Sequence, residues 1–325
     1  MKILIIGGAG MIGQKLLQQL LADKQLGGTS IDEIILFDVV PGVVPPSPEI
    51  PLRVSTGDLS KPAEAAALVA DLPDVIFHLA AIVSGEAEEN FAKGYRINLD
   101  GSRFLFDAIC ATEGYVPRVV FTSSIAVFGA PFPEAIGDDF HTTPLTSYGT
   151  QKAICELLLS DYSRRGLLDG IGIRLPTICV RPGKPNKAAS GFFSNIIREP
   201  LAGAEAVLPV SDDVRHWHAS PRSAVGFLLH AATLDSSIVG PRRNLAMPGV
   251  SVTVGEQVAA LREIAGDVVV ARIRRQPDER IMQMVAGWPR NFAPDRAIKL
   301  GFVADQSFAD IIRVHLEDEL NGVIA

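Results

Sequence analysis

The sequence has few cysteines, no excess of positive charge and no long apolar run, and each shortage excludes a class of protein. Its three cysteines, Cys110, Cys155 and Cys179, lie in apolar or helical-looking surroundings, which argues against a disulfide framework and favours a reducing compartment. The net charge of −7 argues against a nucleic-acid partner, which would require a basic surface.

A membrane location is also disfavoured. No apolar run approaches the roughly twenty residues of a membrane span, and the N-terminal apolar run over 3–6 is too short for a signal peptide and is interrupted by glycines. We therefore expect a cytoplasmic protein with no membrane partner and no metal. A chain of 325 residues with 47% hydrophobic content is sufficient for one large α/β unit with an appended part.

The first feature that is present is a glycine pattern between a buried strand and a helix. Residues 3–6 are apolar, glycines follow at positions 7, 10 and 13, and an apolar stripe at helical spacing begins at Leu16. Gly7 permits a tight turn, Gly10 permits close approach of a pyrophosphate, and Gly13 permits close packing of helix on strand. The helix start at Met11 and Ile12 then offers free N–H groups to phosphates. The alternative is a glycine-rich turn without a ligand.

The second strand favours NAD over NADP. Residues 34–37 form an apolar run that ends in Asp38. A carboxylate at this position accepts hydrogen bonds from the adenosine ribose hydroxyls and repels the 2′-phosphate of NADP. The alternative is a solvated loop aspartate.

Two further strands bring small and polar residues to the same edge of the sheet. The run over 75–81 ends in Leu79, Ala80 and Ala81, which leave room for a cofactor to cross the carboxyl end of the sheet. Within it, His78 is interpreted as a buried, hydrogen-bonded histidine and not as a catalytic one. The run over 119–124 ends in the hydroxyl residues Ser123 and Ser124.

Tyr148 and Lys152 are the candidate acid–base pair. They are four residues apart at the start of a predicted helix, so their side chains share one face. A nearby ammonium is expected to lower the pKa of the tyrosine, which then takes a proton from a substrate alcohol while hydride leaves the same carbon. Ser124 is placed to orient the substrate oxygen. Asn98 lies within a helical pattern that its propensity disfavours, which indicates a local role.

The order of these features resembles the extended short-chain dehydrogenase/reductases, the NAD-dependent epimerase/dehydratase group. The resemblance implies a Rossmann-type, doubly wound parallel sheet over 1–175 with a returning segment near 205–245, and a smaller C-terminal α/β domain, mainly over 176–325, that binds the substrate. It implies NAD contacts from Asp58, Leu59 and Pro176, and a role for Asn98 in holding a water or a backbone carbonyl near the site. It also implies a homodimer through a four-helix interface formed by helices near 91–110 and 149–165.

The position within the family rests on shorter segments. A sugar dehydratase would have an Asp-Glu pair after Ser124, whereas this chain has Ile125 and Ala126. Residues 123–129 are similar to the short-chain L-threonine dehydrogenases. The segments 191–203, 215–218 and 220–222 resemble dehydrogenases of four-carbon sugar acids, which implies oxidation of D-erythronate to 2-oxo-D-erythronate.

A small anionic substrate requires an arginine for its carboxylate. Ser123, Ser124 and Tyr148 are expected to contact such a substrate, His216 and His218 could bind its hydroxyls, and the candidate arginines are Arg174, Arg181, Arg215 and Arg222. Family position favours Arg215, and Arg181 is retained beside it. The alternatives are a nucleotide-sugar 4-epimerase that keeps its NAD, an L-threonine 3-dehydrogenase-like enzyme, and a redox sensor that only binds NAD. The intact Ser-Tyr-Lys set argues against the sensor.

Overall fold

The structure is a computed structural model that describes residues 1–183 and 190–325. The sequence predicts a loop over 183–191 with two lysines, and most of that loop, including Lys184 and Lys187, lies outside the described residues. Within the described part, no helix combines the length and the apolar character that a membrane crossing requires.

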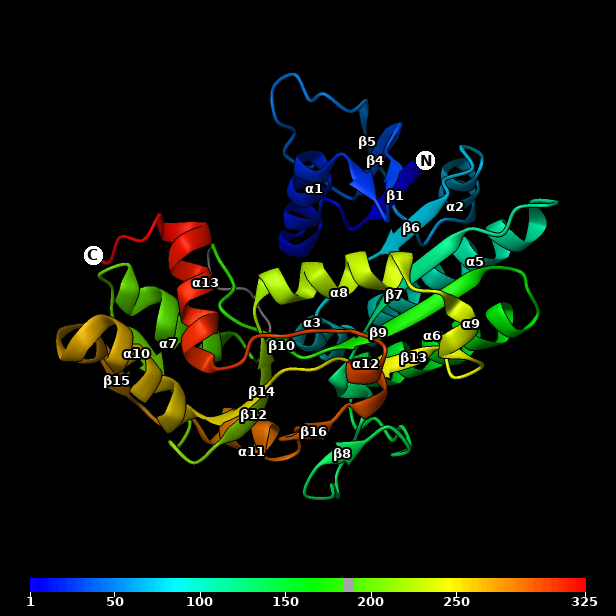
Figure 1. Cartoon of the computed structure of the whole chain (residues 1–325). Helices are drawn as coiled ribbons and strands as arrows, with labels where there is room; N and C mark the ends of the chain where they lie inside the picture. Colours follow the sequence, from blue (N-terminus) through cyan, green and yellow to red (C-terminus); the bar gives the residue numbers. More distant parts are fainter. Residues whose placement is uncertain (184–189) are drawn as a thin grey trace.

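A seven-stranded parallel sheet forms the centre of the molecule (Figure 1). Its order is β13-β9-β7-β6-β1-β4-β5, and the bounds are Lys2–Ile6 for β1, Glu33–Asp38 for β4, Leu52–Thr56 for β5, Val75–His78 for β6, Arg118–Ser124 for β7, Asp169–Leu175 for β9 and Asn244–Ala246 for β13. The inner strands are apolar runs because both of their faces are covered. The predicted Rossmann-type parallel sheet is confirmed.

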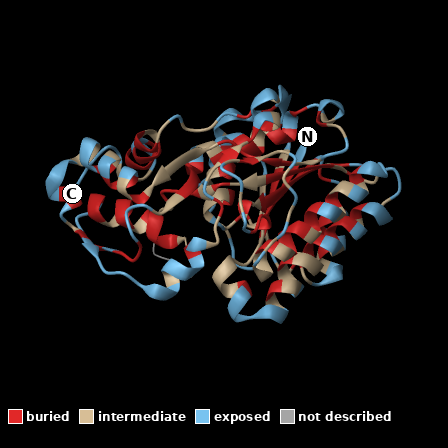
Figure 2. Ribbon diagram, turned by 90° about the horizontal axis from the view of Figure 1, so that it is seen from below, coloured by how far each residue is buried: buried red, intermediate tan, exposed pale blue. Residues whose placement is uncertain are grey.

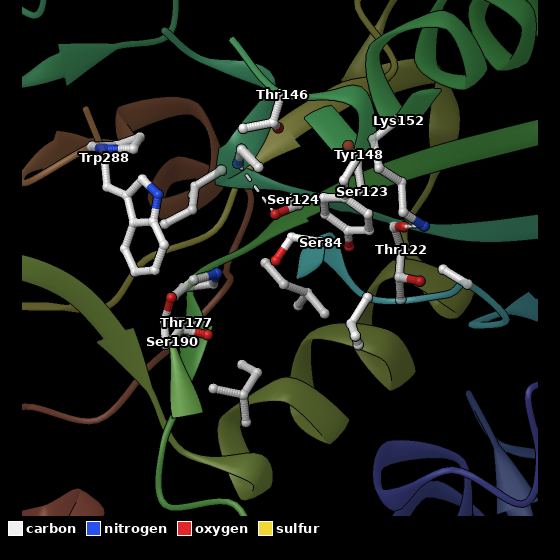
Figure 3. Close-up of a pocket in the computed structure, with 18 of the residues that line it drawn as sticks. Ser84, Thr122, Ser123, Ser124, Thr146, Tyr148, Lys152, Thr177, Ser190 and Trp288 are labelled. Carbon is white, nitrogen blue, oxygen red and sulfur yellow. Dashed lines mark hydrogen bonds between the residues drawn. The ribbon is translucent and has the colours of Figure 1, made fainter. Parts of the chain in front are cut away.

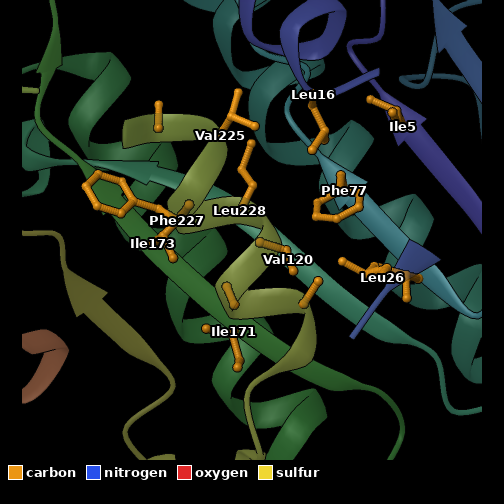
Figure 4. Packing of buried hydrophobic residues seen from close by; sticks show 14 of the residues in the cluster. Ile5, Leu16, Leu26, Phe77, Val120, Ile171, Ile173, Val225, Phe227 and Leu228 are labelled. Carbon is orange, nitrogen blue, oxygen red and sulfur yellow. The ribbon is translucent and has the colours of Figure 1, made fainter. Parts of the chain in front are cut away.

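Helices cover both faces of this sheet. One face carries α1 (Met11–Asp23) and α8 (Pro221–Thr233), and the other carries α2 (Pro62–Val69), α5 (Gly101–Ala111) and α6 (Ser147–Arg164). Side chains of β1 alternate between the two layers, because Ile3 and Ile5 pack on the α1 and α8 side while Leu4 and Ile6 pack on the other. Figure 4 shows Ile5, Phe77 and Val120 of three strands meeting Leu16 of α1 and Leu228 of α8.

The second half of the chain has a core of its own, built on α7 (Gly191–Leu201), α10 (Val254–Val270) and α13 (Phe308–Leu320). A three-stranded sheet of β10 (Thr177–Ile178), β12 (Arg215–Ala219) and β14 (Val250–Thr253) joins this core to the first half, and β11 (Ala206–Leu208) pairs with β15 (Ile273–Arg275). The chain returns to the central sheet through α8 and β13, whereas β11 and β12 stay in the second half. Figure 2 shows buried segments inside both halves.

Several short elements complete the described chain, namely β2 (Gln25–Leu26), β3 (Thr29–Ser30), α3 (Ser84–Glu89), β8 (Ile136–Gly137), α9 (Ser236–Val239), α11 (Glu279–Ala286), β16 (Phe292–Ala293) and α12 (Asp295–Lys299). The helical pattern predicted over 91–110 consists of α4 (Phe91–Gly94), a π-helical stretch (Tyr95–Asp100) and α5. The strand is interrupted at Pro176, because β9 ends at Leu175 and β10 pairs with a strand of the other sheet. That break carries the chain across the carboxyl edge of the central sheet.

Candidate active site

A cavity of about 360 Å³ lies where the two halves meet. The strand ends of the first half form one wall, and the segment after β9 together with β12 and the stretch over 287–289 forms the other (Figure 3). Eleven residues predicted from sequence for the cofactor, the reaction or the substrate line it, namely Met11, Ile12, Leu79, Ala81, Ser123, Ser124, Tyr148, Lys152, Pro176, Arg181 and His216.

The glycine turn fits a dinucleotide. Gly7 has a φ of +89°, and a Cβ on it would lie 2.7 Å from the backbone nitrogen of Ala80. A Cβ on Gly13 would lie 2.4 Å from the Gly7 carbonyl oxygen, so this glycine is required for the close packing of α1 on the turn. Helix α1 begins after Gly10 with no side-chain cap and no acidic residue in its first turn. Its first N–H groups are therefore available to a phosphate.

Asp38 lies directly beside this turn. Its carboxylate accepts hydrogen bonds from the backbone N–H groups of Ala9 at 3.0 Å and Val39 at 2.7 Å. This position matches a ribose-binding carboxylate at the end of the second strand of the fold. Asp58 accepts hydrogen bonds from Ser60 and Arg96, and like Leu59 it lies outside the cavity wall, so the NAD contacts expected of these two residues stay predictions.

Tyr148, Ser124 and Lys152 come together at the carboxyl end of β7. The Ser124 hydroxyl oxygen accepts a hydrogen bond from the Ala126 N–H at 3.1 Å, which leaves its own proton free to donate. Lys152 Nζ donates to the Thr122 carbonyl at 2.7 Å and lies 5.8 Å from the centre of the Tyr148 ring. The predicted helical spacing of Tyr148 and Lys152 thus places both groups on one wall of the cavity.

The pKa of Tyr148 in the protein alone depends on burial and on two neighbouring polar groups, and the expected effect of Lys152 stays a prediction. Burial raises the pKa of the Tyr148 hydroxyl, and the groups that lower it are the Ser124 hydroxyl and the Arg181 guanidinium. The Lys152 ammonium is directed at the Thr122 carbonyl instead of the phenol. Burial also lowers the pKa of Lys152 to about 8, although Cys155 and Glu156 oppose this shift.

Asn98 supports the site from behind. Its amide oxygen accepts from the Ile82 N–H at 2.9 Å, and its amide nitrogen donates to the Ile82 carbonyl and, at 2.7 Å, to Gln151. Asn98 lies in the π-helical stretch, and these hydrogen bonds connect it to the loop after β6 and to α6. Ser123 also has a partner already, because its hydroxyl donates to the buried carboxylate of Glu156. His78 is buried and its ring contacts the Ser102 hydroxyl, as expected for a structural histidine.

Arg181 is the arginine that the structure brings to Tyr148. It is partly buried, its Nε donates to the Ile178 carbonyl at 3.0 Å, and its Nη2 donates to the Ser190 hydroxyl at 2.9 Å. Among the described residues, no carboxylate lies within ion-pair distance of its guanidinium. A partly buried charge without a counter-charge is less favourable than a paired one, so this guanidinium is available to an anionic ligand.

The other candidate arginines have different partners. Arg215 forms an ion pair with Glu256 at 3.2 Å and lines a separate cavity with Arg290, so the structure does not bring it to Tyr148. Arg174 is bound to Glu156, and Arg222 forms exposed ion pairs with the C-terminal helix.

Sequence reasoning missed part of the second wall. Ser84, Thr177, Ser190 and Trp288 line the cavity, and no motif marks them (Figure 3). His216 also lines it, whereas His218 is fully buried behind it. One signal was present in the sequence, because successive residues of a strand point to opposite faces. If 215–218 is a strand, Arg215 and His216 cannot both face the site.

Comparison with known proteins places this geometry in a family. The model of the NAD dependent epimerase/dehydratase family matches residues 3–227. A D-erythronate dehydrogenase of Cupriavidus necator is 46% identical over 323 residues, which cover 98% of each chain. A D-erythronate dehydrogenase of Haemophilus influenzae is 42% identical over 320 residues, which cover 98% of this chain and 100% of the relative.

A solved structure agrees with this placement. The crystal structure described as the nucleoside-diphosphate-sugar epimerase from Agrobacterium tumefaciens superposes with a TM-score of 0.97 at 65% identity, and the match covers 100% of this chain and 96% of that one. The chain therefore belongs to the NAD dependent epimerase/dehydratase family, and NAD is its cofactor.

Proposed function

We propose that this protein is an NAD-dependent dehydrogenase that oxidises a small sugar acid, D-erythronate, to 2-oxo-D-erythronate. The observation that carries the proposal is the partly buried Arg181 guanidinium, which has no carboxylate partner among the described residues and shares a cavity with Tyr148. A substrate carboxylate would supply the missing negative charge. The names of the relatives from Cupriavidus necator and Haemophilus influenzae support the same substrate.

The side chains of the site can each be given a role. With the carboxylate on Arg181, the carbon next to it, which bears the reacting hydroxyl, lies on the side of Tyr148. The Ser124 hydroxyl donates to the substrate oxygen, and Tyr148 takes the proton from that oxygen. Lys152, held by the Thr122 carbonyl, presents its charge to the nicotinamide ribose. Asn98 keeps the loop at Ile82 in place.

NAD supplies the hydride acceptor when it is bound. We propose that it lies over the glycine turn, with the ribose at Asp38 and the phosphates at the start of α1. Residues 1–175 together with α8 and β13 would then bind the cofactor, and most of 176–325 would bind the substrate. The side chains at Ala80 and Ala81 are small, which leaves room for the cofactor to extend towards Tyr148.

The proposal is tested by following NADH formation with purified protein, NAD and a panel of D-erythronate, L-threonate, L-threonine and 3-hydroxybutyrate. NADH formation with D-erythronate is the expected result. Turnover of L-threonine alone would assign a threonine dehydrogenase instead. Binding of NAD without turnover of any substrate would favour the sensor.

A nucleoside-diphosphate-sugar epimerase is the second candidate, because the Agrobacterium tumefaciens structure carries that name. Such an enzyme retains its NAD and releases no net NADH, so product analysis with UDP-galactose separates the two candidates. Arg215 is the candidate substrate arginine that family position favours. Because it pairs with Glu256 and faces a different cavity, the geometry favours the sugar acid.

We also propose a homodimer formed by the exposed faces of α4, α5 and α6. Phe91 and Leu157 expose 63% and 70% of their surface on these helices, and a four-helix interface would bury both. Sedimentation of the wild-type protein and of Leu157→Arg tests this. The wild type should be a dimer and the variant a monomer, and a wild-type monomer would contradict the proposal.

A reducing, cytoplasmic location is proposed as well. Cys110 is exposed, Cys155 and Cys179 are buried, and none of the three is paired with another. Three free thiols fit a compartment that keeps cysteines reduced. Fractionation of the native host, with detection by antibody, tests the location.

A further inference from the structure

Two segments of chain lie between the active-site cavity and a second cavity of about 660 Å³. Strand β12 is one of them, because His216 lines the active-site cavity and the preceding residue, Arg215, lines the second. The stretch over 286–291 is the other, because residues 287–289 line the active-site cavity whereas 286, 290 and 291 line the second. These two segments therefore decide how far the active-site cavity extends.

Trp288 is the largest side chain that they turn towards the active-site cavity. Its indole packs against the His216 ring with the centroids 5.4 Å apart, and it lies 6.5 Å from the Phe193 ring of α7. Phe193 in turn stacks on His216 at 5.1 Å. Figure 3 shows the indole across the cavity from Tyr148, with Ser124 between them. Trp288 thus forms the wall of the cavity opposite Tyr148.

Backbone hydrogen bonds hold Trp288 in this position. Its own N–H donates to the Val285 carbonyl at 3.0 Å, in the last turn of α11. Two residues further on, the Arg290 carbonyl accepts from the Ser251 hydroxyl of β14 at 2.9 Å. The stretch is therefore attached on both sides of the indole, which makes Trp288 a fixed wall.

The active-site cavity has room for a small substrate only. Its volume of about 360 Å³ lies near the lower end of the range of about 300–1,000 Å³ that is usual for ligand sites. Met11, Leu79 and Lys152 line the same cavity, so in the proposed function the nicotinamide end of NAD takes up part of this volume. The space left for the substrate lies between Tyr148 and Trp288.

We propose that Trp288 is a specificity-determining residue that limits the length of the acid that the enzyme oxidises. With the substrate carboxylate on Arg181 and the reacting hydroxyl at Tyr148, the rest of the carbon chain extends towards the indole. A longer chain meets this wall, and the wall cannot move without losing its backbone hydrogen bonds. The site then selects four-carbon acids over sugar acids with one or two more carbons. This inference rests on the proposed oxidation of a sugar acid.

The test measures kcat/KM for acids of increasing length. The acids are D-erythronate and the five- and six-carbon sugar acids of the same configuration at carbons 2 and 3. With the wild type, we expect kcat/KM for the six-carbon acid to be at least about tenfold below that for D-erythronate. Trp288→Ala should raise the ratio of the six-carbon to the four-carbon value by about tenfold or more. Trp288→Phe should give an intermediate ratio, because a phenyl ring replaces only part of the indole.

Arg290→Ala is the matched control. Arg290 lies on the same stretch as Trp288 but lines the second cavity, so its loss should leave the ratio within about twofold of the wild type. A rise in Arg290→Ala as large as that in Trp288→Ala would mean that any loosening of the stretch admits longer acids. It would overturn the role given to the indole.

The outcomes separate the two proposals. If the wild type oxidises none of the acids, the proposed function fails and this inference falls with it. If the wild type oxidises D-erythronate and the six-carbon acid equally well, or if Trp288→Ala leaves the ratio unchanged, only this inference is wrong. The comparison of acids with the wild type does not depend on any variant remaining folded.

Discussion

Replacing Arg181 with methionine should separate activity from stability. The guanidinium is partly buried and has no carboxylate partner among the described residues, so it contributes a charge that the ligand-free fold does not need. Loss of a guanidinium–carboxylate contact in such a cavity costs about 2–5 kcal/mol, which corresponds to a fall in kcat/KM for D-erythronate of about 30- to 5,000-fold. The affinity for NAD should change little.

The free energy of unfolding should change little in the same variant. Arg181→Met removes two hydrogen bonds, to Ile178 and Ser190, but it also removes the desolvation penalty of a partly buried ion. These terms offset each other, so the variant should unfold within about 1–2 kcal/mol of the wild type. Arg174→Met provides the contrast, because it leaves the buried Glu156 carboxylate unpaired and should cost about 3–5 kcal/mol.

The assay is the initial rate of NADH formation together with urea unfolding of the NAD-free proteins. Arg215→Met is the matched control, since this arginine lines the other cavity and its loss should leave kcat/KM within about twofold of the wild type. Wild-type activity in Arg181→Met, or destabilisation as large as in Arg174→Met, would refute the reasoning. Loss of activity in Arg215→Met alone would restore the assignment based on family position.

Three further predictions concern the proton, the cofactor and pH. Tyr148→Phe should lower kcat by about 10²–10⁴-fold with NAD affinity retained by titration, and a near-normal rate would remove Tyr148 from the mechanism. Asp38→Ala should weaken the binding of NAD and reduce the preference for NAD over NADP, measured as the ratio of kcat/KM with NAD to kcat/KM with NADP. An unchanged ratio would contradict the role of the carboxylate. Burial lowers the pKa of His78 to about 3 and those of His216 and His315 to about 4. The unfolded chain therefore binds more protons below about pH 6.5, and the free energy of unfolding should fall as pH drops from 6.5 towards 4, by at most about 1.4 kcal/mol per pH unit for each histidine. Urea unfolding at pH 7.5 and 5 measures this fall, and equal values would contradict it.

The features that could be predicted from the sequence are those fixed by short-range geometry. The strand, glycine turn and helix over 2–23 follow from an apolar run, three glycines and a helical stripe, and Tyr148 and Lys152 share a face because a helix places i and i+4 together. Asp38 is found by its place at the end of a strand. Each inference needs only a few consecutive residues, and the central sheet follows from several of them in order.

The substrate wall could not be predicted in this way. The effect of Lys152 on the pKa of Tyr148 depends on the direction of the Lys152 ammonium. A hydrogen bond to the Thr122 carbonyl on β7 sets this direction. No local sequence pattern distinguishes Arg181 from Arg215 as the arginine that binds the substrate. Their difference comes from tertiary packing, because one lies after the break at Pro176 and the other is on the outward-facing side of β12.

The two walls of the cavity therefore carry different parts of the function. Ser124 lies at the end of β7, Tyr148 and Lys152 lie on α6, and in the proposed mechanism they act on any alcohol placed between them and NAD. In the same proposal the choice of alcohol depends on Arg181 and other residues that reach the cavity only when the second half packs against the sheet. A change of substrate should then require substitutions in the second wall alone, with the proton-transfer residues and the glycine turn left unchanged.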